Sequence, residues 1–177
     1  MNSPMRSNVS SNVRIRGVLA VALATAVAAA APLEAAGVAT PGHRAPAFVL
    51  DRPEGGVLSL ARFAGHPLLI NVFAAWCATC RVEEPLLVRA YAKYKGRVMF
   101  LGVDEQEGAA RATAYARELR VPYPIALDDG PFAASYDTSK IPETILVDAR
   151  GTVRAVYRGL VSARELDRTL ALIAKKE

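Results

Sequence analysis

The sequence predicts an α/β domain in which a central mixed β-sheet is flanked by helices on both faces. Nearly unbroken apolar runs, as in strands buried on both faces, alternate with longer segments of helical pattern. The last two strand candidates flank a short turn at 148–151, which indicates an antiparallel hairpin. Two cysteines separated by two residues stand where the first buried strand gives way to a helix.

Composition limits the classes of function. The chain has 177 residues, 52% of them hydrophobic and 22% charged, which fits one globular domain with a tail. The net charge of +5 includes no block of like charges, so we expect no nucleic-acid partner. Two cysteines and two histidines are badly spaced for a structural zinc site, and the sequence indicates no metal and no cofactor.

Residues 1–36 are expected to be a signal peptide or an N-terminal membrane anchor. Residues 1–16 are polar with only basic charges, 17–33 are apolar and uncharged, and several small residues follow. The apolar run is short for a membrane span and rich in alanine, which favours cleavage, and a core helix is the remaining alternative. We therefore expect a periplasmic or otherwise extracytoplasmic domain, where disulfide chemistry is possible.

The elements of the domain follow in order. Residues 37–46 contain several glycines and prolines and are expected to form a linker, which leads into a domain over 47–177. Strand candidates at 48–50 and 57–60 form a short N-terminal β extension. The first buried strand is expected at 68–73 and a helix from about 77 to 95. The later elements are a strand at 98–103, a helix at 109–119, a strand at 124–127, a helical turn at 132–136, strands at 144–147 and 153–157, and a helix at 162–175.

Cys77 and Cys80 carry the chemistry. At a helix N-terminus, a half-exposed Cys77 would point its sulfur at unpaired backbone N–H groups, which together with the helix dipole lower the pKa of its thiol. Cys77 is then the attacking nucleophile, and the more buried Cys80 resolves the mixed disulfide. The alternative is a structural disulfide in an exported protein.

The first turns of the same helix carry further candidates. Glu83 follows Cys80 by one turn; a buried carboxyl there would have a raised pKa and could exchange a proton with Cys80, whereas an exposed Glu83 would have no such role. Arg81 and Glu84 are interpreted as ordinary surface residues. Pro85 is expected to kink the helix, unless the helix begins only there.

Pro142 is a candidate for a cis peptide bond. It follows Ile141 directly before a predicted strand and after a loop rich in Asp, Ser and Thr. Only a small minority of X-Pro bonds are cis, so the case depends on the place of this proline downstream of the two cysteines.

In combination, these motifs resemble the thioredoxin superfamily, and more closely the exported TlpA/ResA/DsbE-like thiol–disulfide oxidoreductases, which include the cytochrome c maturation reductases. The resemblance extends from Gly42 to the end of the chain. It is carried by Ala-Pro-Ala-Phe-Val-Leu at 45–50, the run 65–76 that leads into the cysteines, Arg81-x-Glu83-x-Pro85, Tyr136, Ile141-Pro142-Glu143-Thr144, Leu-Val-Asp at 146–148 and Gly151.

The resemblance implies a thioredoxin-like fold and roles for particular residues. Cys77 is the nucleophile, Cys80 the resolving thiol, and Glu83 the active-site glutamate of the family. Substrate-binding roles are implied for Trp76, for Ile141 through its backbone, for Pro142 as a cis-proline facing the disulfide, and for Glu143, which would add negative potential as in the cytochrome c maturation branch.

The sequence departs from the family pattern at several positions. Ala78-Thr79 lacks the proline that is common between the cysteines, which leaves the redox potential open. Val72-Phe73 replaces a frequent Phe-Trp, and Ser139-Lys140 stands where a glycine is usual. Asn71 occupies the place of the buried aspartate of thioredoxin, which leaves Glu83 as the expected buried acid. His43 and His66 are expected at the surface.

We therefore expect an exported thiol–disulfide oxidoreductase, acting as a monomer and as a reductant. Its expected partners are cysteine-containing exported proteins, with apocytochrome c or a copper-site protein among them. A membrane electron donor is also expected, because the exported space lacks a reducing buffer.

Two alternative functions fit parts of the sequence. A peroxiredoxin-like peroxidase shares the motif at 45–50. Such an enzyme needs a Thr or Ser three residues before its reactive cysteine, and Ala74 occupies that position before Cys77. A copper-binding chaperone could use the two thiolates, since Cu(I) prefers soft ligands. The further ligands available to it are Met99, His43 and His66, none convincingly placed.

Overall fold

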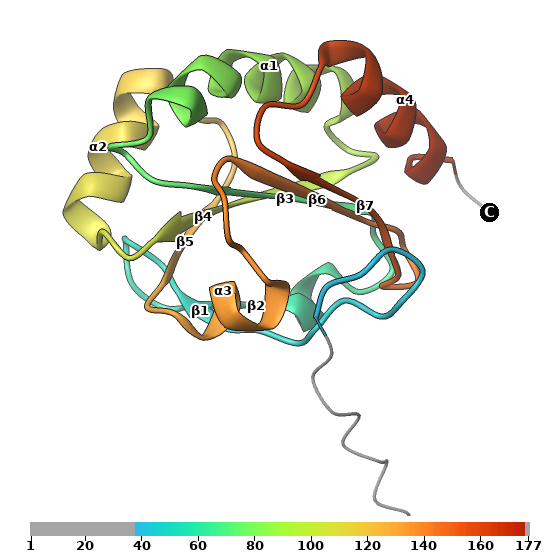
Figure 1. Cartoon of the computed structure of the whole chain (residues 1–177), viewed down its shortest axis with the longest axis horizontal. Coiled ribbons are helices and arrows are strands. Elements are labelled where there is room, and N and C mark those ends of the chain that lie inside the picture. The colour runs from blue at the N-terminus through green and yellow to red at the C-terminus, as the bar shows by residue number, and fades with distance from the viewer. Residues whose placement is uncertain (1–37, 176–177) are drawn as a thin grey trace, which may run out of the picture. The chain divides into compact units, whose positions relative to one another are not determined.

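The computed structural model describes residues 38–175 and shows one seven-stranded sheet in the order β2-β1-β5-β4-β3-β6-β7 (Figure 1). Its strands are β1 (Val49–Asp51), β2 (Val57–Ser59), β3 (Leu68–Phe73), β4 (Met99–Glu105), β5 (Ile125–Asp128), β6 (Glu143–Val147) and β7 (Val153–Arg158). Its helices are the 3-10 helix η1 (Leu60–Phe63), α1 (Ala78–Tyr94), α2 (Ala109–Leu119), α3 (Pro131–Tyr136) and α4 (Ala163–Ile173).

The sheet is mixed, as predicted. β3, β4 and β5 run parallel, and β6, β7, β1 and β2 extend the sheet on either side by antiparallel pairing. Every residue of β3 is buried, because helices or loops cover both faces of this central strand. Its register places Asn71 between Gly102 of β4 and Thr144 of β6.

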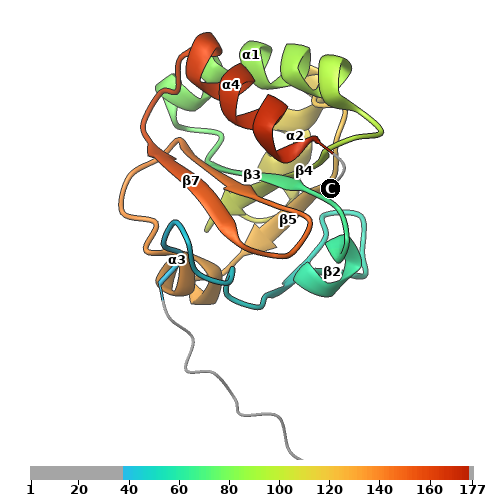
Figure 2. The same cartoon turned by 90° about the vertical axis from the view of Figure 1, so that its right-hand side faces the viewer.

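Alternate residues of β3 pack into hydrophobic cores on opposite faces of the sheet. Leu68, Ile70 and Val72 pack with α3 and the N-terminal strands. Leu69 packs with α1 and α4, and Phe73 packs with α2 and the two cysteines. Figures 1 and 2 show the same division, with α1, α2 and α4 on one face and α3 on the other. Helices on both faces were expected from the sequence.

The predicted elements are present, with ends that shift by one or a few residues. The prediction of a helix over 109–119 is confirmed in α2. The candidate strand at 57–60 is shorter, because Leu60 already belongs to η1. α1 continues through Pro85, so the alternative of a helix beginning at that proline is wrong. Ser162 caps α4 and accepts a hydrogen bond from the Glu165 N–H, as in a capping box.

The segment before β1 is bonded to the rest of the domain. The backbone N–H groups of Gly42 and Ala45 donate to the carbonyls of Val153 and Gly151, and Tyr136 donates its hydroxyl proton to the Pro46 carbonyl. These bonds hold residues 42–46, which were expected to be part of a linker, against the β6–β7 hairpin and α3.

The predicted signal peptide or anchor at 1–36 lies outside the described residues. Each helix that the structure describes in 38–175 is too short or too polar to span a bilayer.

Candidate active site

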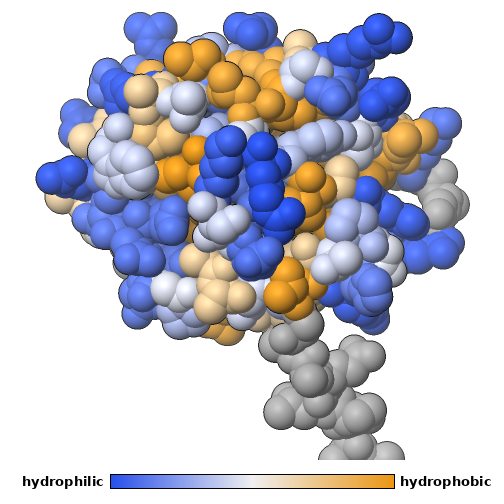
Figure 3. Space-filling model, in the orientation of Figure 1, coloured by the Kyte–Doolittle hydropathy of each residue, from blue (hydrophilic) through white to orange (hydrophobic). Residues whose placement is uncertain are grey.

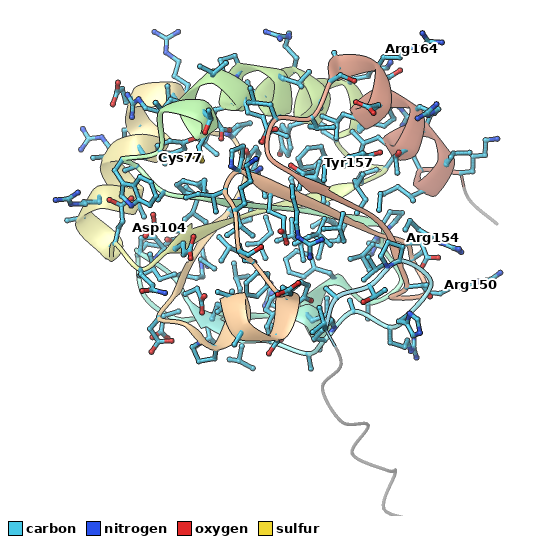
Figure 4. The ribbon with its side chains drawn as sticks, viewed as in Figure 1. Cys77, Asp104, Arg150, Arg154, Tyr157 and Arg164 are labelled. Atoms are coloured by element: carbon cyan, nitrogen blue, oxygen red, sulfur yellow. A yellow bond between two sulfur atoms is a disulfide. The ribbon has the colours of Figure 1, made fainter. Side chains whose placement is uncertain are left out.

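Cys77 and Cys80 form a disulfide at the start of α1 (Figure 4). The S–S distance is 2.14 Å and the two Cα atoms are 5.3 Å apart. β3 ends at Phe73, and three residues carry the chain from the sheet to Cys77, the N-cap of α1. The strand-to-helix junction thus places the predicted pair at the end of the central strand.

The Cys77 sulfur faces the N-terminal turn of α1. It accepts a hydrogen bond from the Cys80 N–H at 3.1 Å and lies 3.3 Å from the Thr79 hydroxyl. In the reduced protein, these donors and the helix dipole would stabilise a Cys77 thiolate. The expectation of a half-exposed Cys77 is wrong, because only 4% of its surface is exposed. The cluster of Phe73, Ala74 and Tyr115, with Ile141 packed against it, covers most of the residue.

An open pocket gives access to the disulfide. It brings together the turn before α1, the end of β4 and the loop before β6, and its lining residues are Trp76, Cys77, Ala78, Thr79, Glu105, Ser139, Lys140 and Ile141. Trp76 is 66% exposed at its rim. Figure 3 shows hydrophobic and hydrophilic residues mixed over the face seen in Figure 1. A protein segment could therefore reach Cys77 from this pocket.

The Ile141–Pro142 peptide bond is cis. Ile141 lines the pocket and packs against the cluster that contains both cysteines. Pro142 leads directly into β6, and its carbonyl accepts a hydrogen bond from Gly159 at 2.7 Å. The structure thus brings Trp76, Ile141 and the cysteines together, as the resemblance implies.

Glu83 is a buried carboxyl with defined partners. It is 2% exposed; one oxygen accepts from the Val161 N–H at 2.9 Å and the other from the Asn71 side chain at 3.0 Å. Asn71 also donates to the Thr144 hydroxyl at 3.0 Å. Burial raises the pKa of Glu83, and the two hydrogen bonds oppose that rise. The alternative of an exposed Glu83 is wrong.

Glu143 is also buried, behind the cis-proline. One carboxylate oxygen lies 3.2 Å from Nε of Arg158. Burial raises the pKa of Glu143 to about 7, and the neighbouring Arg158 charge limits the rise. A carboxyl with this pKa is only partly ionised at neutral pH, so the negative potential implied by the resemblance would depend on pH.

Sequence reasoning missed Glu84. It was expected at the surface, yet it is 1% exposed and accepts hydrogen bonds from the hydroxyls of Tyr115 and Tyr123. Both tyrosines lie more than thirty residues further along the chain, so a local pattern could not reveal them. The available signal was the four-residue spacing from Cys80, which places Glu84 on the same side of the helix. Arg81 is partly exposed and pairs with Glu118.

Asp104 is a second missed acid. It lies at the end of β4 (Figure 4), fully buried, and within the described residues neither oxygen makes a hydrogen bond of normal geometry. Burial raises the pKa of Asp104 to about 6, and the nearby charge of Glu107 adds to the rise. The Glu107 carboxylate itself accepts from the Ala75 N–H in the turn before the cysteines.

The residues considered for copper binding do not join the cysteines. His43 and His66 are exposed, as predicted, and Met99 lies at the start of β4, away from the end that lines the pocket. In the described part of the chain, no three His, Cys, Asp or Glu residues are grouped so that they could hold a metal ion.

Comparison with known proteins gives consistent results. The model of the AhpC/TSA family matches residues 41–156. The thiol:disulfide interchange protein DsbE of Vibrio cholerae is 36% identical over 139 residues, covering 76% of this chain and 74% of that protein. The thiol-disulfide oxidoreductase ResA of Bacillus subtilis is 28% identical, with 77% of each chain covered. A solved thiol:disulfide interchange protein of the thioredoxin family from Chlorobium tepidum TLS superposes with a TM-score of 0.69 at 26% identity, covering 77% of this chain and 99% of that one.

Proposed function

The chain belongs to the AhpC/TSA family as a thiol–disulfide oxidoreductase of the DsbE/ResA type, and from this premise we propose that it reduces disulfides of exported proteins through Cys77 and Cys80. One observation carries the proposal. The Cys77–Cys80 disulfide stands at a helix N-terminus beside an open pocket, with a cis-proline loop on the other side of that pocket. A purely structural disulfide has no need of such a pocket.

The reduction proceeds by two thiol–disulfide exchanges. The Cys77 thiolate attacks one sulfur of the target disulfide, so that a Cys77–target bond forms and the second target sulfur leaves as a thiolate. The Cys80 thiolate then attacks the Cys77 sulfur and displaces the first target sulfur. Two electrons pass to the target, both of its sulfurs take up protons from the surroundings, and Cys77–Cys80 is left oxidised.

The surrounding residues support both exchanges. The Cys80 N–H, at 3.1 Å from the Cys77 sulfur, favours Cys77 as a thiolate and as a leaving group. Glu83 is the proposed proton acceptor for Cys80, since burial raises the pKa of its carboxyl and so favours the uptake of a proton. The target segment would lie in the pocket between Trp76 and Ile141. Pro142 and Glu143 follow Ile141 directly in the chain.

The proposed place of action is extracytoplasmic. The basic, apolar and small-residue order of 1–36 supports export by a signal peptide, with retention as an anchor as the second possibility. Each turnover leaves the disulfide oxidised, so a membrane electron donor must reduce it again. The proposed clients are cysteine pairs of exported proteins, with the Cys-x-x-Cys-His segment of an apocytochrome c as the first to test and a copper-site protein as the second.

Trapping tests the proposal directly. Cys80→Ser should accumulate a mixed disulfide between Cys77 and an oxidised Cys-x-x-Cys-His peptide, because the resolving thiol is missing. Cys77→Ser should form no such adduct and should lose all exchange activity. Mass spectrometry after acid quenching reads both results; recovery of only the free Cys80→Ser protein would contradict the mechanism.

A further inference from the structure

Glu84 is a buried acid that the two exchanges above do not use. It lies four residues after Cys80 on α1, on the side that faces α2 and the segment before β5. One of its oxygens accepts from the Tyr123 hydroxyl and the other from the Tyr115 hydroxyl at 3.2 Å. In the described residues, no lysine, arginine or histidine forms an ion pair with it.

The Tyr115 hydroxyl connects Glu84 to the resolving cysteine. Its oxygen lies 3.2 Å from the Glu84 carboxylate and 3.3 Å from the backbone carbonyl oxygen of Cys80. A phenol has one proton to donate, so it can satisfy only one of these two acceptors at a time. An ionised carboxylate is the stronger acceptor and will hold that proton. A neutral Glu84 can instead donate its own proton to Tyr115, which frees the phenol proton for the backbone carbonyl oxygen of Cys80.

The other groups around Glu84 do not neutralise it. On α1, Glu83 is its neighbour, and the like charge adds to the effect of burial in raising the pKa of Glu84, while the two tyrosine hydrogen bonds lower it. The Arg81 guanidinium lies 5.8 Å from the centre of the Tyr115 ring, but it pairs with Glu118 of α2. Towards β5, the ring of Tyr91 contacts Tyr123 and brings no charge.

We propose that Glu84 and Tyr115 form a proton-sensitive pair behind Cys80, which lowers the fraction of Cys80 thiolate while Glu84 is ionised and raises it once Glu84 is protonated. Two effects act in the same direction. A buried negative charge one helical turn away disfavours a second one on the sulfur. It also draws the Tyr115 proton away from the backbone carbonyl of Cys80, where that hydrogen bond would withdraw electron density from the residue that bears the thiolate. Glu84 is a positioning residue here, since it acts on Cys80 through Tyr115 and through its charge.

The proposal deepens the proposed function, because the Cys80 thiolate carries out the resolving step. An ionised Glu84 would slow the release of the target and lengthen the life of the mixed disulfide. A protonated Glu84 would speed that release. The pair would thus make the time a client remains bound depend on pH.

The test uses the full chain with Cys77→Ser, which leaves Cys80 as the only thiol. The rate of alkylation by iodoacetamide, followed from pH 5 to 10, reports the Cys80 thiolate. Adding Glu84→Gln removes the charge, and its amide can donate to Tyr115 as a neutral carboxyl would. At pH values below the thiol midpoint at which the wild-type Glu84 is ionised, we expect alkylation about tenfold faster, which corresponds to a midpoint roughly one pH unit lower. At lower pH, where Glu84 is protonated, the two rates should converge.

Three further variants separate the proposed link from other effects. Glu118→Gln removes an exposed carboxylate from the same neighbourhood and should change the rate less than twofold. In a Tyr115→Phe background the effect of Glu84→Gln should fall below about threefold, because the hydrogen-bond link is gone. In a Tyr123→Phe background it should persist, because Tyr123 contacts Glu84 but makes no hydrogen bond to Cys80.

The outcomes distinguish this proposal from the proposed function. An unchanged midpoint in Glu84→Gln, or an equal shift in Glu118→Gln, would overturn the role of Glu84 even if the wild-type protein reduces disulfides. A wild-type protein without reductase activity would overturn the proposed function, and the midpoints would still stand. If Glu84→Gln does not fold, the triple variant Glu84→Leu, Tyr115→Phe, Tyr123→Phe removes all the polar groups together and should shift the midpoint in the same direction.

Discussion

Asn71 decides how Glu83, the proposed active-site acid, is held. Its side-chain amide has two protons, and the structure gives one to Glu83 and the other to Thr144, both at 3.0 Å. An aspartate here would place a second negative charge beside Glu83, whereas an asparagine holds Glu83 as a donor. The departure from thioredoxin at this position therefore agrees with Glu83 as the acid that serves Cys80.

Replacing Glu83 by glutamine should slow the reductase reaction by about a hundredfold at pH 7, since a positioned acid or base contributes this order of rate. Stopped-flow fluorescence of Trp76, the single tryptophan, can follow each exchange. The loss should lie in the resolving step, with the first attack by Cys77 nearly unchanged. An equal loss in both steps would contradict the assignment, and Glu54→Gln in the exposed turn between β1 and β2 is the matched surface control.

Asp104 should make stability depend on pH. Its pKa is about 6 in the folded chain against 3.8 without burial, so the folded state binds the extra proton. Stability is then unaffected by this group below about pH 4, falls as the pH rises, and stays reduced above about pH 6. Asp104→Asn should be more stable than the wild type by roughly 2 kcal/mol at pH 8 and equal to it at pH 3.5. Urea unfolding of the oxidised protein at both values checks this; an equal gain at both would contradict it.

The start of α4 is linked to the active site. Val161, which donates its N–H to Glu83, lies two residues before α4, and Ser162 between them caps the helix. The cap therefore stabilises both the helix and the turn that holds Glu83.

Ser162→Ala should lower the free energy of unfolding by about 1 kcal/mol, the usual cost of losing an N-cap side chain. Denaturant unfolding measures it. Ser135→Ala on α3 is a suitable control, because that hydroxyl only donates to a carbonyl within its own helix. A cost no larger than that of the control would show that the cap adds nothing.

Periodicity and spacing predicted most elements because local sequence determines them. The apolar run at 68–73 became the central strand, and the helix after the cysteines formed from 78 to 94. Leu60 was predicted to belong to the strand at 57–60 but is the first residue of η1. No glycine or proline between β2 and η1 marks the end of the strand. The exact ends of strands and helices depend on hydrogen bonds that cannot be deduced from the sequence pattern.

The site could be predicted only where its residues are neighbours in sequence. The cysteine pair and Glu83 lie within seven residues, so spacing identified them. Glu84 and the burial of Cys77 could not be predicted in this way, because Tyr115, Tyr123 and Ile141 arrive from distant elements of the fold. Buried carboxyls are rare, and their burial shows only once the partners are in place.

At the scale of the whole molecule, the two faces of the sheet contribute differently. One face of the sheet, with α1, α2 and α4, carries the cysteines and the acids Glu83 and Glu84. The other face, with α3 and the N-terminal strands, packs against the opposite side of the same strands. The loops that line the pocket come from the ends of β3 and β4 and from the start of β6. The sheet therefore positions the loops between which the proposed client would bind, while α1 holds the two sulfurs.

The equilibrium reduction potential of Cys77–Cys80 tests the central claim most directly. It would be measured in the purified domain against glutathione and dithiothreitol buffers, with alkylation of the free thiols as the readout. As a reductant, the protein should show a value near or below about −250 mV, in the range of thioredoxin. A value of about −120 to −180 mV is that of oxidants and isomerases, and it would contradict the proposal that electrons flow from this protein to its clients.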